Sequence, residues 1–287
     1  MKSQNLDALS RIVDLDKIEA TKNSINQANG LPNECYLNDE YFKIEREKVF
    51  FNNWIVVGVS SSVPEVGDTK PFNLMGIPLL ILRDKNNKIR VFHNVCSHRG
   101  MILVNEECKL KNTIRCPYHS WSYNFNGELI ATPHVGGMNI HETEGFIKSK
   151  SNLKEVSTYV WMDLIFINVN KNKKDFEESI NPLEKQWSKF ISKDDQKLIR
   201  HARDFGYFNM EVKSNWKLAI ENYCESYHLP WVHPELNRVS NLKDHYHIED
   251  LAETFSGQGS NKYSQQFDGN KKLFTFPNWP KNLYQNS

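Results

Sequence analysis

Two short stretches, "VFHNVCSHRG" (residues 91–100) and "CPYHSW" (residues 116–121), decide the fold of the region around them. Each stretch contains one cysteine and one histidine: Cys96 with His98, and Cys116 with His119. Runs of β-type residues separated by turn residues flank both stretches, so we expect each pair on its own loop of a small antiparallel β domain. Two thiols and two imidazoles in this arrangement indicate a metal centre.

The spacing of these four residues distinguishes two kinds of metal site. Zinc fingers usually group cysteine with cysteine and histidine with histidine, whereas here residues 99–115 separate two mixed pairs. A [2Fe-2S] cluster in which two histidines replace two cysteines requires this split, because one iron takes the thiolates and the other takes neutral imidazoles. The sequence therefore favours such a cluster. A structural zinc site, or buried residues without a metal, are the alternatives.

A second candidate metal motif lies in the segment "ENYCESYHLPWVHPEL". The spacing of its apolar residues predicts one helix over residues 215–228, which Pro230 ends, with Glu225 and His228 on one face. His233 follows the break, so the chain can return a second imidazole to the same point. Two imidazoles and a carboxylate with open positions are typical of non-haem Fe(II) oxygenases. Alone, these histidines would more often be ordinary surface or core residues, but a cluster upstream favours an iron site because O2 activation needs electrons delivered singly.

The composition argues against some classes of partner. The 287 residues carry a net charge of +1, with 39% hydrophobic and 25% charged residues, which gives no reason to expect nucleic acid or an anionic membrane as partner. The first twenty residues are charged throughout, so we expect no secretory signal, and the apolar runs are too short to span a membrane. Five cysteines do not make a disulfide scaffold in a chain of this length, which favours a reducing, cytoplasmic setting.

The hydrophobic and turn patterns divide the chain into three predicted regions: residues 1–45, 46–170 and 171–287. The first is a helical leader, in which Asp39 is the expected N-cap of a helix. The second contains the β-type runs of the antiparallel domain, including a strand-like apolar run at residues 159–169. The third begins with helix-permitting sequence and continues with a strand candidate at residues 202–214.

The residues "NVCSHRGMIL" and "CPYHSWSYNFNGELIATP" resemble the Rieske domain of the Rieske non-haem iron oxygenases. Arg99 and Gly100 after the first pair and Trp121 after the second belong to this likeness, which runs from about Leu31 to the end of the chain. Position 120 is often glycine in this family and is Ser120 here. The resemblance implies an α+β fold, in which a Rieske-type antiparallel β domain is inserted before an incomplete helix-grip catalytic domain.

The resemblance also implies roles for the site residues. The [2Fe-2S] cluster would be held by Cys96, His98, Cys116 and His119. His228 and His233 would bind the mononuclear Fe(II), and Glu225 would bridge this iron to a Rieske histidine of a neighbouring subunit in a homotrimer. The family's third iron ligand is an acid further downstream, so we expect a truncated chain that lacks this carboxylate. The acids present do not stand in matching context: Asp244, Glu249, Asp250, Glu253 and Asp268. His245 and His247 are expected on one face of a strand, as polar residues at a pocket rim or on the surface.

The function implied is that of an oxygenase component. An NAD(P)H-dependent reductase or a ferredoxin would supply electrons, which pass through the cluster to the mononuclear iron for O2-dependent hydroxylation or oxidative N-demethylation of a small molecule. The bridging acid is usually Asp, and Glu225 together with Pro234 is similar to the branch acting on betaine-, carnitine- or choline-like quaternary ammonium compounds. Three alternatives stay open: an aromatic-ring-hydroxylating dioxygenase α subunit, a Rieske ferredoxin that only carries electrons, and a zinc-stabilised binding module.

Overall fold

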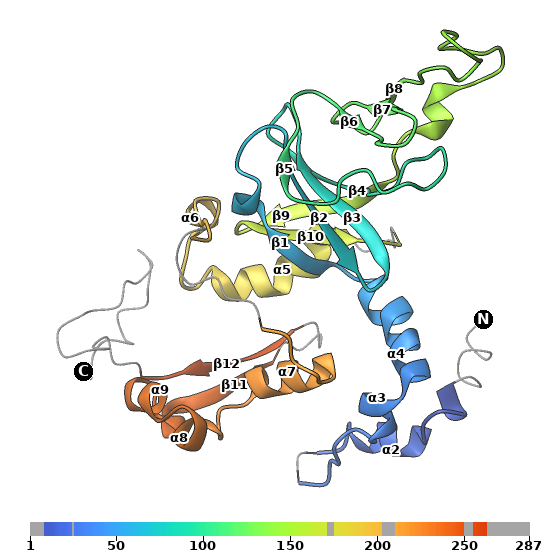
Figure 1. The fold of residues 1–287 in the computed structure, drawn as a ribbon. Coiled ribbons are helices and arrows are strands. Elements are labelled where there is room, and N and C mark those ends of the chain that lie inside the picture. The colour runs from blue at the N-terminus through green and yellow to red at the C-terminus, as the bar shows by residue number, and fades with distance from the viewer. Residues whose placement is uncertain (1–8, 25, 171–174, 203–209, 250–254, 263–287) are drawn as a thin grey trace. The chain divides into compact units, whose positions relative to one another are not determined.

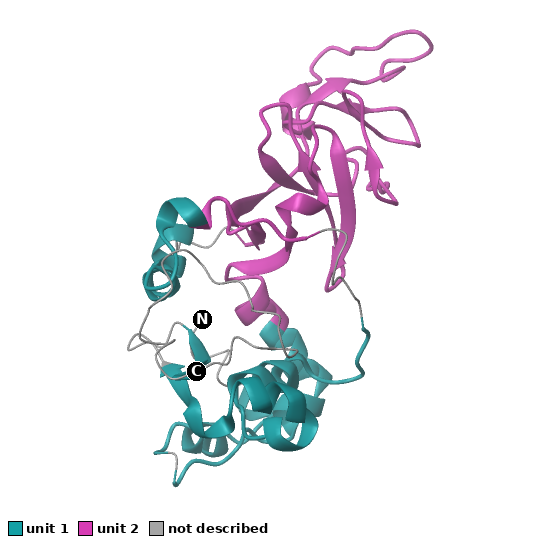
Figure 2. Ribbon diagram, turned by 90° about the vertical axis from the view of Figure 1, so that its left-hand side faces the viewer, with its two compact units in different colours: residues 1–45, 174–195, 209–287 teal, residues 46–173, 196–208 magenta. Residues whose placement is uncertain are grey.

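The structure is a computed structural model that describes residues 9–24, 26–170, 175–202, 210–249 and 255–262. Its contacts separate two units (Figure 2): unit 1 with residues 1–45, 174–195 and 209–287, and unit 2 with residues 46–173 and 196–208. The three regions expected from the sequence stay predictions, since contacts alone do not define a domain.

Most of the helices are short (Figure 1). They are α2 Leu15–Ala20, α3 Glu34–Leu37, α4 Asp39–Glu45, α5 Phe176–Trp187, α6 Lys193–Gln196, α7 Trp216–Cys224, α8 Leu229–Val232 and α9 Pro234–Val239. Short 3-10 or π-helical turns are η1 Arg46–Phe50, η2 Ser60–Ser62, η3 Lys148–Ser151 and η4 Leu242–Asp244. Within the described ranges, we find no helix with the length and hydropathy to cross a lipid bilayer.

The N-cap of α4 is Asn38 rather than Asp39. The Oδ1 of Asn38 accepts the backbone N–H of Glu40 at 2.9 Å and that of Tyr41 at 3.1 Å. The sequence prediction is therefore wrong by one residue. Asn38 is the residue whose side chain reaches the N–H groups that the first turn leaves without an intrahelical acceptor.

Unit 2 contains two antiparallel sheets. The larger has seven strands in the order β1-β10-β9-β4-β3-β2-β5, and the smaller has three in the order β6-β7-β8. The strands are β1 Ile55–Val59, β2 Asp68–Leu74, β3 Ile77–Arg83, β4 Ile89–His93, β5 Cys108–Lys109, β6 Ile114–Arg115, β7 Ser122–Tyr123, β8 Leu129–Ala131, β9 Glu155–Trp161 and β10 Leu164–Asn168. In unit 1, β11 His245–Glu249 pairs antiparallel with β12 Ser256–Ser260. The strand expected around His245 and His247 is therefore confirmed.

The apolar run at residues 159–169 forms a hairpin rather than one strand. β9 ends at Trp161 and β10 begins at Leu164, and the two residues between them, Met162 and Asp163, have φ angles of 49° and 67°. Positive φ at both central residues is the type I′ geometry, whose twist matches that of an antiparallel pair. The sequence conceals this turn because neither central residue is the usual Gly or Asn.

Strand β3 is buried on both faces, which explains its continuous apolar sequence. Leu80 and Leu82 belong to a core on one face, whereas Leu79 and Ile81 belong to a core on the other. We call the first the loop-side core: Leu80, Leu82, Phe92, Cys96, Leu103, Val104, Ile114, Cys116, Trp121, Tyr123, Phe125, Leu129 and Leu153. The opposite core consists of Phe51, Val63, Leu79, Ile81, Ile89, Val91, Val156, Ile165, Ile167 and Val169. Both predicted cluster cysteines therefore lie in the loop-side core.

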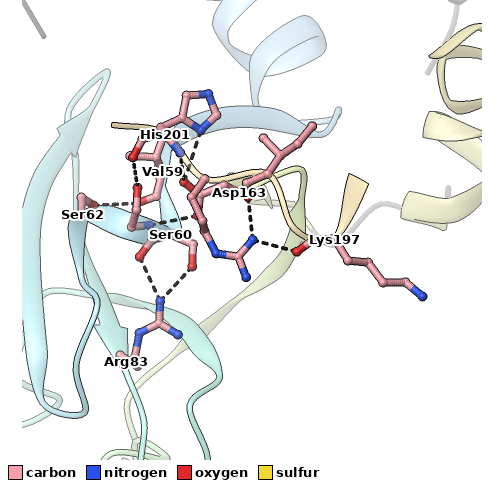
Figure 3. A network of polar contacts seen from close by, with 10 residues as sticks. Val59, Ser60, Ser62, Arg83, Asp163, Lys197 and His201 are labelled. Carbon is pink, nitrogen blue, oxygen red and sulfur yellow. Dashed lines mark hydrogen bonds and ion pairs between the residues drawn. The ribbon is translucent and has the colours of Figure 1, made fainter. Parts of the chain in front are cut away.

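The β9–β10 turn also anchors the segment that follows α6 (Figure 3). The carboxylate of Asp163, 3% exposed, accepts the backbone N–H of Ser61 at 3.1 Å and that of His201 at 2.9 Å. Arg83 donates to the carbonyl and the hydroxyl of Ser60 at 2.9 and 2.8 Å. Hydrogen bonds offset the cost of burying this carboxylate, so the network fixes the backbone at His201. The strand expected at residues 202–214 is not found at residue 202 or at residues 210–214, and residues 203–209 lie outside the described residues.

Candidate metal centres

The two loops that carry the predicted cluster residues share one hydrogen-bond pattern. In each loop the cysteine N–H donates to the carbonyl five residues later, and the N–H four residues later donates back to the cysteine carbonyl. These distances are 2.8 and 2.9 Å for Cys96, and 2.8 and 3.1 Å for Cys116. The fourth residue is Gly100 or Ser120, with φ of 70° or 59°. The paired spacing in the sequence therefore corresponds to two matched turns.

The thiols of these loops lie inside the domain and the imidazoles lie at its surface. Cys96 and Cys116 are each 2% exposed, and neither forms a disulfide. The ring centroids of His98 and His119 lie 4.9 Å apart at 65°, and Trp121 stacks on His98 at 4.5 Å and 11°. In the part of the chain that the structure describes, no three His, Cys, Asp or Glu side chains form a group that could hold one metal ion. In a [2Fe-2S] cluster of this kind one iron takes two thiolates and the other takes two imidazoles, and these two loops supply that donor set.

Burial and neighbouring groups set the protonation of this donor set. Burial raises the pKa of the Cys96 thiol, and the neighbouring Cys116 raises it further, while a hydrogen bond with Tyr123 lowers it. Burial also lowers the pKa of His98, and the charge of His119 acts in the same direction. The imidazole is thus favoured in the neutral form that binds metals, whereas the thiols release their protons when a metal binds.

Tyr123 contacts the predicted cluster loops, and the sequence reasoning did not include it among the candidate residues. Its side chain is fully buried, and its hydroxyl lies 3.2 Å from Sγ of Cys96 and 2.8 Å from Oγ of Ser97. Burial raises the pKa of Tyr123, so the phenol stays neutral and keeps its proton. The Ser97 hydroxyl donates to the carbonyl of Ser151, which leaves the Tyr123 proton for Ser97 or the thiolate. No pattern in the sequence distinguishes this residue from an ordinary core tyrosine.

The second motif begins at a helix end instead of lying on one helix. α7 ends at Cys224, and Glu225 has extended backbone angles, φ −124° and ψ 159°. His228 precedes α8, and Pro230 lies in the first turn of that helix. The predicted helix over residues 215–228 is therefore wrong in its last turn. Pro230 starts a helix because proline is well tolerated in a first turn, where its missing N–H costs nothing.

This break brings the three predicted residues of the motif together. The carboxylate of Glu225 accepts a hydrogen bond from ring Nδ1 of His228 and from the N–H of Tyr227, the latter at 2.7 Å. The rings of His228 and His233 have centroids 5.4 Å apart at 75°. A carboxylate on Nδ1 leaves the lone pair of Nε2 for a metal, as is usual for histidine ligands. These residues therefore fit an iron site with two imidazole ligands.

The charge of Glu225 is compatible with this arrangement. Partial burial would raise the pKa of Glu225, but the hydrogen bonds from His228 and Tyr227 outweigh it and hold the pKa below its usual value. The carboxylate is therefore ionised and accepts the proton of His228 Nδ1 in a charge-assisted hydrogen bond.

The third iron ligand stays a prediction. Of the acids considered from the sequence, Asp244 lies in η4, and three fall outside the described residues: Asp250, Glu253 and Asp268. Glu249 ends β11.

Two protein-family models match the regions that carry the two candidate metal sites. The family model of the Rieske [2Fe-2S] domain matches residues 53–147. The model of the ring hydroxylating alpha subunit (catalytic domain) matches residues 199–285.

Individual relatives agree with the family matches. The chain is 29% identical to the carnitine monooxygenase oxygenase subunit of Acinetobacter pittii over 203 residues, covering 71% of this chain and 52% of that protein. It is 27% identical to the chloroplastic choline monooxygenase of Arabidopsis thaliana over 274 residues, covering 91% of this chain and 63% of that protein. A solved quaternary ammonium Rieske monooxygenase, studied for carnitine oxidation and inter-subunit electron transfer, matches with a TM-score of 0.67 at 25% identity. That match covers 84% of this chain and 64% of the solved chain.

The chain spans between half and two thirds of the length of these relatives. The matches confirm the predicted fold class, and they confirm the predicted cofactors, a [2Fe-2S] cluster and a mononuclear iron. The individual ligand residues stay predictions. The chain therefore carries a Rieske [2Fe-2S] domain at residues 53–147 and, over residues 199–285, a region similar to the catalytic domain of the ring hydroxylating alpha subunits, which is the domain pair of the Rieske non-haem iron oxygenases that it resembles.

Proposed function

We propose that this chain acts in an oxygenase component, which receives electrons at a [2Fe-2S] cluster and uses them at a mononuclear non-haem iron to oxidise a small molecule with O2. The observation that carries this proposal is the presence of two distinct donor sets in one chain. One is the pair of loops with buried thiols and outward imidazoles, and the other is the motif of Glu225, His228 and His233. A Rieske ferredoxin would need only the first set.

In this proposal the loop residues hold the cluster by its two ends. Cys96 and Cys116 would bind on the core side, while His98 and His119 would bind on the surface side. When bound, the cluster supplies single-electron transfer, and the ferrous iron supplies the activation of O2. Electrons would enter and leave on the imidazole side, because only that side of the donor set is close to the surface.

The second donor set would hold the iron and receive the electrons. Glu225 keeps the proton of His228 on Nδ1, so that Nε2 of His228 and the ring of His233 can serve as ligands. We propose the same carboxylate as the bridge to a Rieske histidine of a neighbouring subunit in a homotrimer. The inter-subunit electron transfer described for the solved relative supports this bridge. An NAD(P)H-dependent reductase or a ferredoxin as electron donor, and a cytoplasmic location, complete the proposal.

For the substrate we propose a quaternary ammonium compound, oxidised by hydroxylation or by removal of an N-methyl group. Relatives of this chain are named carnitine and choline monooxygenases. Two aromatic side chains beside the iron motif, Tyr227 at 73% exposure and Trp231 at 85%, are able to face a ligand. Aromatic faces attract quaternary ammonium groups through cation–π interactions.

Anaerobic reconstitution tests the two metal centres. We expect a brown protein with inorganic sulfide, a rhombic EPR signal after reduction, and additional Fe(II) beyond the cluster. His228→Ala should lose the additional iron and keep the cluster, whereas His247→Ala, an exposed histidine on β11, should keep both. A colourless protein that holds zinc without sulfide would overturn the cluster, and unchanged iron in His228→Ala would overturn the mononuclear site.

Oxygen uptake with a suitable reductase tests the substrate class. We expect uptake with carnitine, choline, glycine betaine or γ-butyrobetaine, and formaldehyde release where an N-methyl group is removed. The second candidate is an aromatic-ring-hydroxylating dioxygenase, which the description of the matched catalytic domain favours. Uptake and dihydroxylated product with aromatic acids alone would select that candidate.

A further inference from the structure

His245 on β11 uses both of its ring nitrogens in contacts within unit 1. Its Nε2 lies 2.8 Å from the hydroxyl and 3.2 Å from the carbonyl oxygen of Ser240, and its Nδ1 lies 3.3 Å from Oε1 of Gln258. The tautomer with Nδ1–H donates to Gln258 and lets Nε2 accept the hydroxyl proton, and it leaves the Ser240 carbonyl without a proton from His245. Ser240 is only 5% exposed and the His245 ring is half-buried. His245 is therefore a partly buried member of a hydrogen-bond network.

Gln258 on β12 extends this network to the iron motif. Its Nε2 donates to the carbonyl of Tyr223 at 3.0 Å and to that of Glu225 at 3.4 Å. Only one orientation of the amide suits its surroundings, because exchanging Oε1 and Nε2 would place an oxygen against two carbonyl oxygens. The amide therefore accepts from the histidine on one side and donates to the end of α7 on the other.

Together the two side chains connect both ends of the segment that carries the proposed iron ligands. This segment begins at Glu225, contains His228, α8, His233 and α9, and reaches Ser240 directly after α9. Gln258 holds its first end and His245 holds its last. The ladder pairs Gln258 with His247, two residues from His245, so both side chains stand on one face of the hairpin.

We propose that His245 and Gln258 are positioning residues for the mononuclear iron. This inference rests on the proposed function, because it assumes that His228 and His233 bind iron. His245 and Gln258 do not serve as ligands themselves. They close a loop of sixteen residues, 225 to 240, and so fix the two imidazoles relative to each other before iron binds. Without this closure the segment would sample other geometries, and part of the binding free energy would go into ordering it.

Fe(II) affinity of the anaerobic protein tests the proposal. His245→Phe and Gln258→Leu keep much of the side-chain volume but lose the hydrogen bonds. We expect each to weaken Fe(II) binding at least tenfold, within the ten- to hundredfold loss typical when a group that orients a metal ligand is removed. His245→Asn, whose amide can still donate to Gln258, should recover much of the affinity. The matched control is His247→Phe on the same strand, which should bind Fe(II) like the unaltered chain.

Two further measurements separate positioning from folding. The [2Fe-2S] EPR signal reports on unit 2, and circular dichroism of the iron-free protein reports on overall folding. A purely structural role would lower the melting temperature of the iron-free protein and leave the Fe(II) dissociation constant of the folded fraction unchanged, which would overturn the inference. If His245→Phe unfolds, the Fe(II) dissociation constants of Gln258→Leu and His245→Asn are compared instead. Weaker binding by Gln258→Leu than by His245→Asn supports the positioning role, and equal, unaltered binding by both overturns it.

The outcome for His228→Ala keeps this inference distinct from the proposed function. If His228→Ala loses iron while His245→Phe and Gln258→Leu bind it normally, the positioning role is wrong and the iron site stands. If His228→Ala itself loses no iron, the proposed function is wrong first.

Discussion

Two residues in equivalent places, Gly100 and Ser120, show how a single side chain affects the cluster loops. Both have positive φ, at 70° and 59°, and both donate their N–H to the carbonyl of the loop cysteine. Glycine adopts this conformation freely, whereas an L-residue is strained there by roughly 1–2 kcal/mol. Ser120 recovers part of this cost, because its hydroxyl accepts a hydrogen bond from Arg115 at 2.9 Å. The serine that departs from the family's usual glycine is thus tolerated at a small net cost.

We predict that Ser120→Gly stabilises the protein by about 0.5 kcal/mol, since relief of backbone strain exceeds the loss of one exposed hydrogen bond. Gly100→Ala should have the opposite sign and destabilise by about 1 kcal/mol, although its Cβ would meet no atom within 4 Å. Urea unfolding of the cluster-loaded protein measures both. A less stable Ser120→Gly would mean that the contact with Arg115 outweighs the strain.

We predict that Tyr123→Phe lowers the reduction potential of the cluster by about 40 mV. The tyrosine hydroxyl lies 3.2 Å from Sγ of Cys96, and a hydrogen bond to a thiolate stabilises the reduced, more negative state. If the hydrogen bond stabilises the reduced cluster by about 1 kcal/mol more than the oxidised cluster, the reduction potential rises by about 40 mV for a one-electron couple. A redox titration followed by EPR measures the shift. Tyr118→Phe, at an exposed tyrosine beside His119, is the control and should leave the potential unchanged.

The sequence could indicate candidate ligand residues but not the groups that contact them. Cys96, His98 and their counterparts in the second loop stand out as candidates because thiols and imidazoles at short, ordered spacings have few other uses. Tyr123 has no such signature, since a tyrosine in a strand is most often a core residue. The contacts of Gln258 could not be predicted from the sequence for another reason. Its amide donates to backbone carbonyls of the iron motif that lie more than thirty residues away in the chain.

The elements of unit 2 depend on tight hairpin turns, and the turn between β3 and β4 is organised by one buried carboxylate. Asp84 accepts the N–H groups of Asn86 and Lys88 at 2.8 and 2.9 Å, and the Nε of Arg90 at 2.8 Å. Its side chain is 1% exposed. Burial alone would raise the pKa of Asp84, but the bonds from Arg90 and the two backbone groups outweigh it and lower the pKa below the usual value.

This turn should make the β domain sensitive to acid. A carboxyl group whose pKa is lower in the folded state than in the unfolded state contributes stability that is fully present above the unfolded pKa of about 3.9. That contribution is lost as the pH falls through the folded pKa. We predict that Asp84→Asn destabilises unit 2 by about 2 kcal/mol at pH 7, because it removes a charged partner of Arg90. The deficit should shrink as the pH falls below about 4.

Unfolding curves at several pH values measure this effect. Glu106→Gln, at an exposed carboxylate, is the control and should follow the unaltered protein at every pH. A deficit of the same size at pH 3 and pH 7 would show that the charge of Asp84 is not responsible.

Element boundaries were predictable where periodicity decides and unpredictable where a turn interrupts it. The strands around residues 77–83 and 89–93 follow from continuous or alternating apolar sequence. The turn at Met162 and Asp163 and the end of α7 at Cys224 do not, because the residue pattern continues across both. At both places the break is accompanied by side-chain and backbone hydrogen bonds that a one-dimensional pattern does not contain.

At the scale of the whole chain, unit 1 is closed by contacts between residues far apart in sequence. The Nζ of Lys217, at the start of α7, lies 2.7 Å from a carboxylate oxygen of Glu45, 172 residues earlier. Three aromatic rings surround this ammonium at 5.2 to 5.5 Å, those of Tyr36, Tyr41 and Trp216. Both charged side chains are about 10% exposed. A largely buried ion pair with cation–π neighbours therefore ties the first forty-five residues to the helix that leads into the iron motif.

We predict that Lys217→Met destabilises unit 1 by about 3–5 kcal/mol, because it leaves a buried carboxylate without its counter-charge. The double variant Glu45→Gln with Lys217→Met should recover a large part of this loss, since no unpaired charge remains buried. Thermal unfolding followed by circular dichroism measures both, and the [2Fe-2S] signal should persist in each. Equal losses in the single and the double variant would contradict a role for charge burial. The sequence did not reveal this contact, because pairing over such a separation leaves no local pattern.

Alternate residues of strand β3 pack into two different hydrophobic cores. Odd-numbered leucine and isoleucine positions, Leu79 and Ile81, serve one interior, while the even-numbered Leu80 and Leu82 serve the interior that surrounds the cysteines. Removing or adding one residue within this strand would exchange the two sets and present the wrong shapes to the cysteine loops. Removing or adding two residues together would keep each remaining side chain on its present face of the sheet. Length variation within this strand should therefore be tolerated only in even steps, even though the proposed metal ligands lie elsewhere in the chain.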